Sequence, residues 1–133
     1  MSDFVLNPSS FAYVRNGSVG YSFSGIKTAA GVIEDMINIA DTGLHDLQVR
    51  ATYNIEWLQV ADTIGWIGSI DGNEIWNWNC DATQLVQWGA QGPLIFEFIC
   101  PAQSALQIRT TNGAGSTGAS RGCMLIAWPL FVK

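Results

Sequence analysis

The clearest pattern in the chain is a strict alternation of apolar and polar side chains over residues 47–57. Apolar residues take every second position from Leu47 to Trp57, and polar residues stand between them. A period of two predicts a long antiparallel strand with one face on a core. At Leu58 the pattern changes phase, which predicts a β-bulge or a bend onto a second sheet.

Shorter apolar runs predict further strands, and turn-forming residues separate them. Asp71-Gly72 lies between two such runs and is a strong hairpin signal. The run at 94–100 is apolar apart from Glu97, so we expect one of its faces to be buried throughout and the other partly. Residues 112–122 contain four glycines and are predicted to form a flexible loop. The expected shorter strands are residues 11–14, 21–24, 64–67, 74–80, 85–88, 94–100, 106–110 and 123–132.

Residues 29–41 fit two different structures. Apolar residues recur at helical spacing from Ala29 to Ala40, which predicts an amphipathic helix. Gly31 and several β-branched residues in the same segment favour a strand instead, over residues 32–39. Both structures stay open at this point.

The whole pattern predicts an all-β protein. Roughly eight short strands with frequent turn signals and at most one short helix are typical of a single antiparallel β-sandwich. The long strand with its phase change and the hydrophobic last strand favour a jelly roll. Residues 1–20 are apolar without a regular period, so we expect an N-terminal extended arm there and the sandwich domain over residues 21–133.

Composition narrows the class of function. The chain has 133 residues, of which 48% are hydrophobic and 13% charged, and its net charge is −5. This balance excludes a disordered chain, and the acidic charge argues against nucleic-acid binding. The N-terminus does not resemble a signal peptide, and no apolar run is long enough to span a membrane, so we expect folding in a cytoplasm.

The residues capable of nucleophilic chemistry are few and scattered. Cys80, Cys100 and Cys123 are too widely spaced for a zinc site, so buried thiols are expected, with one disulfide or a reactive thiol as the alternatives. Arg121 is the only cation close in sequence to a cysteine, and we expect it to swing into water. His45 is the single histidine, and the sequence has no Gly-x-Ser-x-Gly motif that would present a nucleophilic serine to it.

Two further motifs are better explained by turns than by chemistry. Residues 113–118 match G-x-G-x-x-G, but an apolar strand follows where a dinucleotide site requires a helix. Asp71, Asn73 and Glu74 supply three oxygen ligands, fewer than the six to eight that calcium takes. We therefore expect no catalytic residue, no metal and no cofactor.

The string Trp76-Asn77-Trp78-Asn79 is the most unusual in the sequence. Alternation places both indoles on one face and both amides on the other. Both tryptophans can be core residues with solvated amides opposite, anchors of a subunit contact, or a platform on which a sugar stacks. All three interpretations remain open.

In overall character the chain resembles the small capsid-associated proteins of tailed bacteriophages, of the decoration or cement kind. The features shared are a short acidic chain, an N-terminal arm, a strand-rich body, a Gly/Ser loop and a Trp-rich surface with few charges. The resemblance rests on no specific motif. It implies a jelly roll or sandwich that binds a capsid lattice as a homo-oligomer, with a trimer as the expected number.

We therefore predict a non-enzymatic structural virion protein that binds and stabilises a phage capsid by burying apolar surface. Its expected partners are capsid protein and further copies of itself, with no nucleic acid and no membrane. The alternative is a glycan-binding, lectin-like module in which Trp76, Trp78 and Trp88 contact sugars. The expected interface residues are Phe4, Val5, Leu6, Phe11, Tyr13, Trp76 and Trp78.

Overall fold

The structure is a computed structural model that describes residues 12–14, 19–28, 31, 33–55, 63–81, 94–113 and 120–130. No helix in these ranges is long and apolar enough to cross a membrane. The strands in these ranges are β1 (Ala12–Val14), β2 (Val19–Lys27), β3 (Ile33–Ile39), β4 (Leu47–Ile55), β5 (Thr63–Ile70), β6 (Asn73–Asp81), β7 (Leu94–Cys100), β8 (Leu106–Asn112) and β9 (Arg121–Pro129).

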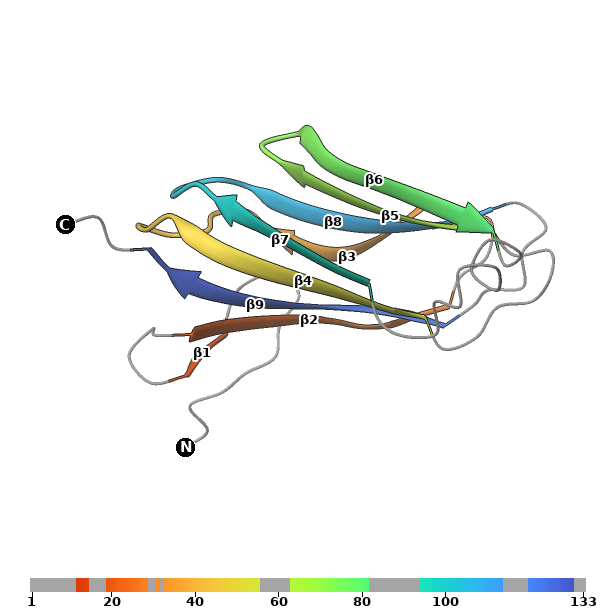
Figure 1. Ribbon diagram of the computed structural model, residues 1–133, viewed down its shortest axis with the longest axis horizontal. Coiled ribbons are helices and arrows are strands. Elements are labelled where there is room, and N and C mark those ends of the chain that lie inside the picture. The colour runs from red at the N-terminus through yellow and green to blue at the C-terminus, as the bar shows by residue number, and fades with distance from the viewer. Residues whose placement is uncertain are drawn as a thin grey trace.

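These strands form two sheets that face each other (Figure 1). The five-stranded sheet has the order β1-β2-β9-β4-β7, and the four-stranded sheet has the order β3-β8-β5-β6. Strands pair antiparallel in reverse chain order: β2 with β9, β3 with β8, β4 with β7 and β5 with β6. A long hairpin wrapped into two sheets gives this order, which is that of a jelly roll. The predicted all-β sandwich is confirmed.

The long strand β4 lies between β9 and β7 and has the predicted parity. Four alternate side chains of β4 are at most 1% exposed: Leu47, Val49, Ala51 and Tyr53. Their neighbours Gln48 and Arg50 point to the other face and are half-buried or exposed. The predicted phase change at Leu58 lies outside the described residues, as does the strand expected at 85–88.

The ambiguous segment is a strand, β3, and a β-bulge explains why it resembled a helix. Its pairing with β8 shifts register between Asp35 and Ile37. The shift lets the adjacent residues Met36 and Ile37 both point inward, where they are 1% and 0% exposed. Two adjacent buried residues imitate helical spacing, and the β-branched residues that favoured a strand decide the outcome.

The predicted hairpin at Asp71-Gly72 is confirmed between β5 and β6. Both turn residues have positive φ, 50° at Asp71 and 82° at Gly72, as a type I′ turn requires. The Asp71 carboxylate accepts a hydrogen bond from the Ala105 amide at 2.8 Å, and the Asp71 amide donates to the Ala105 carbonyl at 2.8 Å. The carboxylate thus holds the turn against the loop that leads into β8.

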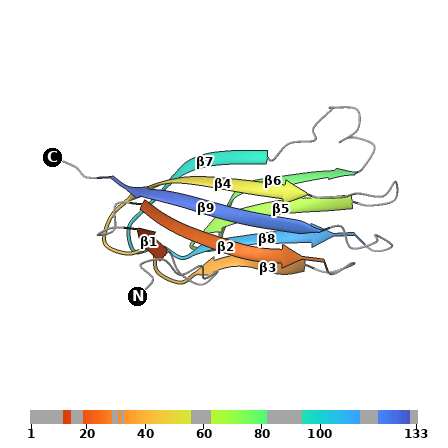
Figure 2. The ribbon, with the colours of Figure 1, turned by 90° about the horizontal axis from the view of Figure 1, so that it is seen from below.

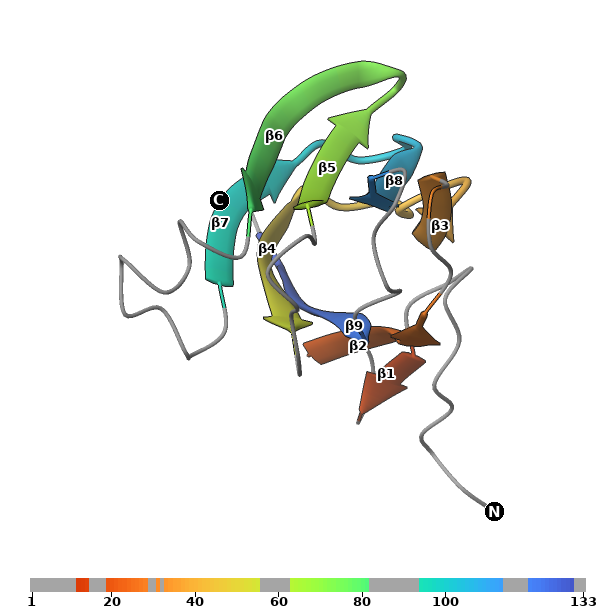
Figure 3. The same ribbon diagram turned by 90° about the vertical axis from the view of Figure 1, so that its right-hand side faces the viewer.

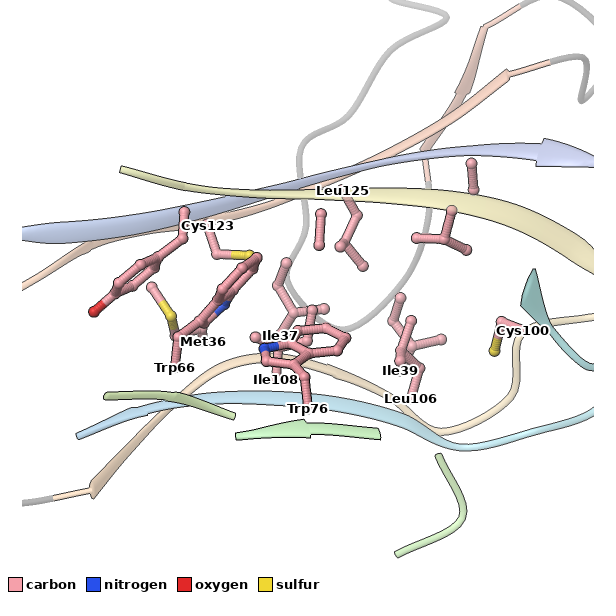
Figure 4. Close-up of a cluster of buried hydrophobic side chains, with 14 of the residues drawn as sticks. Met36, Ile37, Ile39, Trp66, Trp76, Cys100, Leu106, Ile108, Cys123 and Leu125 are labelled. Carbon is pink, nitrogen blue, oxygen red and sulfur yellow. The ribbon is translucent and has the colours of Figure 1, made fainter. Parts of the chain in front are cut away.

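The core lies between the two sheets (Figure 4). It contains a connected row of aromatic side chains. Tyr53 of β4 stacks on Trp66 of β5 with ring centroids 5.1 Å apart and an interplanar angle of 9°. Trp66 contacts Trp76 of β6 at 4.9 Å, and Trp76 contacts Phe96 of β7 at 4.7 Å. This row runs from β4 and β5 to the edge strands β6 and β7, which lie on the same side of the sandwich in Figure 3.

Arg121 corrects the sequence analysis. It begins β9 instead of belonging to a loop, and it is fully buried. Its Nε donates to Thr110 Oγ1 at 3.0 Å and its Nη2 to Glu34 Oε1 at 3.1 Å. The expectation that Arg121 swings into water is wrong, because the buried Thr110 and the partly buried Glu34 hold its charge inside.

The predicted domain boundary near residue 20 stays a prediction. Residues 1–11 lie outside the described part of the chain. β1 pairs with β2 at the edge of the five-stranded sheet, with Tyr13 opposite Gly20. This short pairing agrees with the strand expected at 11–14.

Candidate functional site

The outer face of the five-stranded sheet is turned toward the viewer in Figure 2. Most of its side chains are apolar. Register places Phe23, Met124, Thr52 and Ile95 in one row across four strands. The apolar side chains of this face are half-buried or exposed, and together we call them the apolar outer face: Tyr21, Phe23, Ile26, Ile95, Ile99, Met124, Ile126 and Trp128. The polar side chains among them are Gln48, Arg50, Thr52, Asn54 and Glu97.

The outer face of the four-stranded sheet is different, because polar side chains dominate it. Gln107 donates to the Asp35 carboxylate at 3.0 Å, and Asn79 donates to Asn77 Oδ1 at 2.7 Å. Ile33 is its one strongly exposed apolar residue in the described part of the chain. The polar side chains of this face are Asp35, Asn38, Asn77, Asn79, Gln107, Arg109 and Thr111. The sandwich therefore has one polar outer face and one apolar outer face.

Within the described part of the apolar outer face, the charged side chains form a single pair. Arg50 Nε and Glu97 Oε1 are 2.7 Å apart on neighbouring strands, and the two side chains are 45% and 49% exposed. The Arg50 guanidinium also lies 5.8 Å from the ring centroid of Trp128. Such an exposed pair contributes little to stability, about 0–1 kcal/mol. Its effect is to neutralise the two charges that this face carries.

An apolar pocket of about 300 Å³ opens between the edge strands β6 and β7. Trp66 and Trp76 form its inner wall, and the side chains of β7 close one side. Trp78 also lines the pocket and meets Tyr53 edge-on at 6.3 Å. The pocket thus joins the aromatic row of the core to the surface.

The interface residues predicted from the sequence are only partly placed. Trp76 is 8% exposed and belongs to the core, while Trp78 is half-buried and packs against that core. Asn77 and Asn79 are exposed, which agrees with a core indole at Trp76 and solvated amides opposite it, and an interface role of the two tryptophans stays a prediction. Phe4, Val5, Leu6, Phe11 and the side chain of Tyr13 lie outside the described residues.

The apolar outer face is what the sequence reasoning missed. The signal was present at residues 94–100, where both parities are apolar. The structure shows that Ile95 and Ile99 are 57% and 59% exposed, so the expectation of partial burial on the second face is wrong for these two residues. The reason is that Ile95 and Ile99 point away from the core, beside Thr52 and Gln48 of β4, and that β7 has a neighbouring strand on one side only in the described structure.

The side chains that could take part in catalysis lie in places where they serve the fold. Cys100 and Cys123 are free, buried thiols, as predicted, and burial raises the pKa of Cys100 to about 11 and that of Cys123 to about 12. The side chain of Cys80 lies outside the described residues. His45 is exposed, and the neighbouring Asp46 carboxylate accepts a hydrogen bond from the Ala102 amide at 2.8 Å. The described ranges contain no group of three side chains able to hold a metal ion.

Comparisons with known proteins find structural likeness only. No protein-family model matches the chain, and no curated protein matches it. The crystal structure of the infectious bursal disease virus VP2 subviral particle superposes with a TM-score of 0.49 and 10% identity, over 84% of this chain and 32% of that chain. A structure of the Gx strain of the same virus gives 0.46 and 13%, over 97% and 37%. This chain thus spans about a third of those proteins, and values this low establish no shared function.

Proposed function

We propose that the chain is a structural virion protein that joins capsid protein and further copies of itself through the apolar outer face, without chemistry of its own. The observation that supports this proposal is the contrast between the two outer faces. A monomeric antiparallel sandwich usually presents polar side chains on both outer faces, and large apolar patches on a monomer mark interaction sites. Jelly rolls occur in viral capsid domains and in lectins.

The low charge of the apolar outer face suits a contact that excludes water. Its only described charges, Arg50 and Glu97, neutralise each other at 2.7 Å. Covering an unpaired charge would cost free energy because the charge loses its hydration, whereas covering a paired charge costs much less. Attachment to the outside of a phage capsid, and assembly as a trimer, are the more specific forms of this proposal.

The test replaces Ile126, which lies in the middle of the apolar outer face beside Arg50 in the register. Ile126→Glu adds a charge to that face, and Asn38→Glu adds the same charge to the polar face as a matched control. We expect the wild type and the control to form large assemblies or to co-sediment with capsid shells, and Ile126→Glu to do neither while keeping its circular dichroism. A wild type that neither assembles nor co-sediments contradicts the proposal.

A glycan-binding role is the second candidate from the sequence, and the burial of Trp76 counts against it. Its ring contacts Trp66 and Phe96 and is 8% exposed, so little of it is open to a sugar. Trp78 is half-buried, and Trp88 lies outside the described residues. Specific binding on a glycan array that Ile126→Glu leaves intact would favour the lectin function over the structural one.

A further inference from the structure

Four strands lie at sheet edges, and three of them carry features that hinder pairing with another chain. β1 has only three residues. β3 has a register break between Asp35 and Ile37, and the pairing of β6 with β5 has a break between Gly68 and Ser69. Short edges, bulges and charged or polar side chains are the usual protections of edge strands.

The fourth edge strand, β7, lacks these protections in the described structure. Its seven residues pair with β4 in an unbroken register, from Leu94 opposite Tyr53 to Cys100 opposite Leu47. Its one charged side chain, Glu97, is already paired with Arg50 at 2.7 Å. The described chain places no strand on its other side. The unpaired backbone groups of such an edge are complementary to another β-strand.

The sequence of β7 indicates that a second copy of β7 fits this edge. Around Glu97 it reads Ile-Phe-Glu-Phe-Ile, the same in both directions. When two copies pair antiparallel with Glu97 at the centre, Ile95 comes opposite Ile99 and Phe96 comes opposite Phe98. Apolar pairs directly opposite each other stabilise strand pairing, and a two-fold axis makes each of these contacts twice.

We propose that two copies of this chain form a symmetric dimer by antiparallel pairing of β7 with β7, centred on Glu97. The dimer joins the two five-stranded sheets into one continuous sheet, and the apolar outer face then extends over both copies. This contact uses the edge of the sheet and not its face. It therefore goes beyond the proposed virion function and does not depend on it, but it is an alternative to the trimer form of that proposal.

The ion pair of Arg50 with Glu97 fits this arrangement. Two Glu97 carboxylates directly opposite each other would repel. Arg50 lies opposite Glu97 in the β4–β7 register, so each copy brings a compensating charge to the same row. The row across the axis then has no net charge. Phe96, which lines the pocket, would meet Phe98 of the second copy on the inner side.

Cysteine cross-linking tests the register directly. Residues directly opposite each other in an antiparallel pair have Cα atoms about 4.5–5.5 Å apart, within the range of a disulfide. In a Cys80→Ser background, Glu97→Cys should form a disulfide-linked dimer under mild oxidation. Ile95→Cys should not, because its own symmetry mate lies far along the strand. Equal cross-linking of both variants, or of neither, overturns the proposal.

Sedimentation with matched lysine variants tests the contact itself. The double variant Ile95→Lys/Ile99→Lys places like charges opposite each other across the axis, and we expect it to raise the dimer Kd by about tenfold or more. The control Ile26→Lys/Ile33→Lys changes two other isoleucines of similar exposure, 56% and 61%, and should leave the Kd unchanged.

The outcomes separate this dimer from the proposed virion function. A wild type with the mass of a monomer or a trimer, or equal weakening by both lysine pairs, overturns the dimer. Ile126→Glu lies two strands away from β7 and should keep the dimer while it loses larger assembly. Failure of capsid assembly with an intact dimer would therefore contradict only the virion function.

Discussion

At the scale of single residues, the hydroxyl of Thr110 is a hydrogen-bond partner of the buried cation Arg121. Thr110 Oγ1 accepts a hydrogen bond from Arg121 Nε at 3.0 Å and lies 2.8 Å from Tyr53 Oη. It also donates to the Gly65 carbonyl at 3.0 Å. A hydroxyl has one proton and two lone pairs, so this arrangement uses its whole capacity. When its proton is on the Gly65 carbonyl, Thr110 accepts from both Arg121 and Tyr53, whose Oη also lies 3.4 Å from the same carbonyl oxygen.

Thr110→Val keeps the shape of this side chain and removes its hydroxyl. We expect the free energy of unfolding to fall by about 1–3 kcal/mol, because Arg121 and Tyr53 each lose one buried partner. Urea unfolding followed by tryptophan fluorescence measures the change. Thr52→Val, on the outer side of β4, should stay within about 0.5 kcal/mol of the wild type. Equal losses in the two variants would show that the hydroxyl network contributes nothing specific.

At the scale of elements, close packing inside the hairpin limits which residues it accepts. A Cβ added at Gly68 of β5 would overlap the ring of Trp76 on β6. That ring has little room to move, because Trp66 and Phe96 contact it. Gly122 of β9 offers a contrast: an added Cβ would lie 3.4 Å from the Gly25 carbonyl oxygen and 3.5 Å from Ile26 Cδ1, both ordinary contacts.

Gly68→Ala should destabilise the protein by about 1–3 kcal/mol through overpacking against Trp76. Gly122→Ala should be neutral or stabilising by up to about 1 kcal/mol, because alanine reduces the freedom of the unfolded chain. Thermal unfolding of both variants measures the difference. A larger loss for Gly122→Ala than for Gly68→Ala would contradict the packing of the hairpin on its tryptophan.

At the scale of the whole molecule, the sandwich controls the reactivity of its thiols. Cys100 and Cys123 lie between the two sheets (Figure 4), and burial raises the pKa of each thiol, to about 11 and about 12, from an ordinary value of 9.0. The thiolate is the reactive form. The folded protein therefore holds both cysteines protonated and covered at neutral pH.

In a Cys80→Ser variant at pH 8, both remaining thiols should react with an aromatic disulfide reagent only as fast as the protein unfolds. Addition of urea should make both react at once. Since the folded pKa values exceed the unfolded one, the stability linked to these groups is present below about pH 9 and is lost as pH rises toward 12. A thiol that reacts within seconds in the folded protein would contradict this and reopen an enzymatic function.

Local patterns in the sequence predicted the parity of β4 and the turn at Asp71-Gly72, because both depend on neighbouring residues alone. The segment at 29–41 could not be decided in this way. Its bulge between Asp35 and Ile37 forms only where the strand pairs with β8, a partner about 70 residues distant in the chain.

By itself, the sequence determined the class of fold: alternation and turn residues specify strands, and strands with one apolar face require a second layer. Only the tertiary structure decided which apolar faces are covered. Ile95 and Ile99 lie on an outer face because they pair with Thr52 and Gln48, which point away from the core, and Arg121 is buried because Glu34 and Thr110 reach it from other strands. A pattern of period two distinguishes the two faces of a strand. Which face meets another layer depends on the order of the strands in the sheet, and residues distant in sequence set that order.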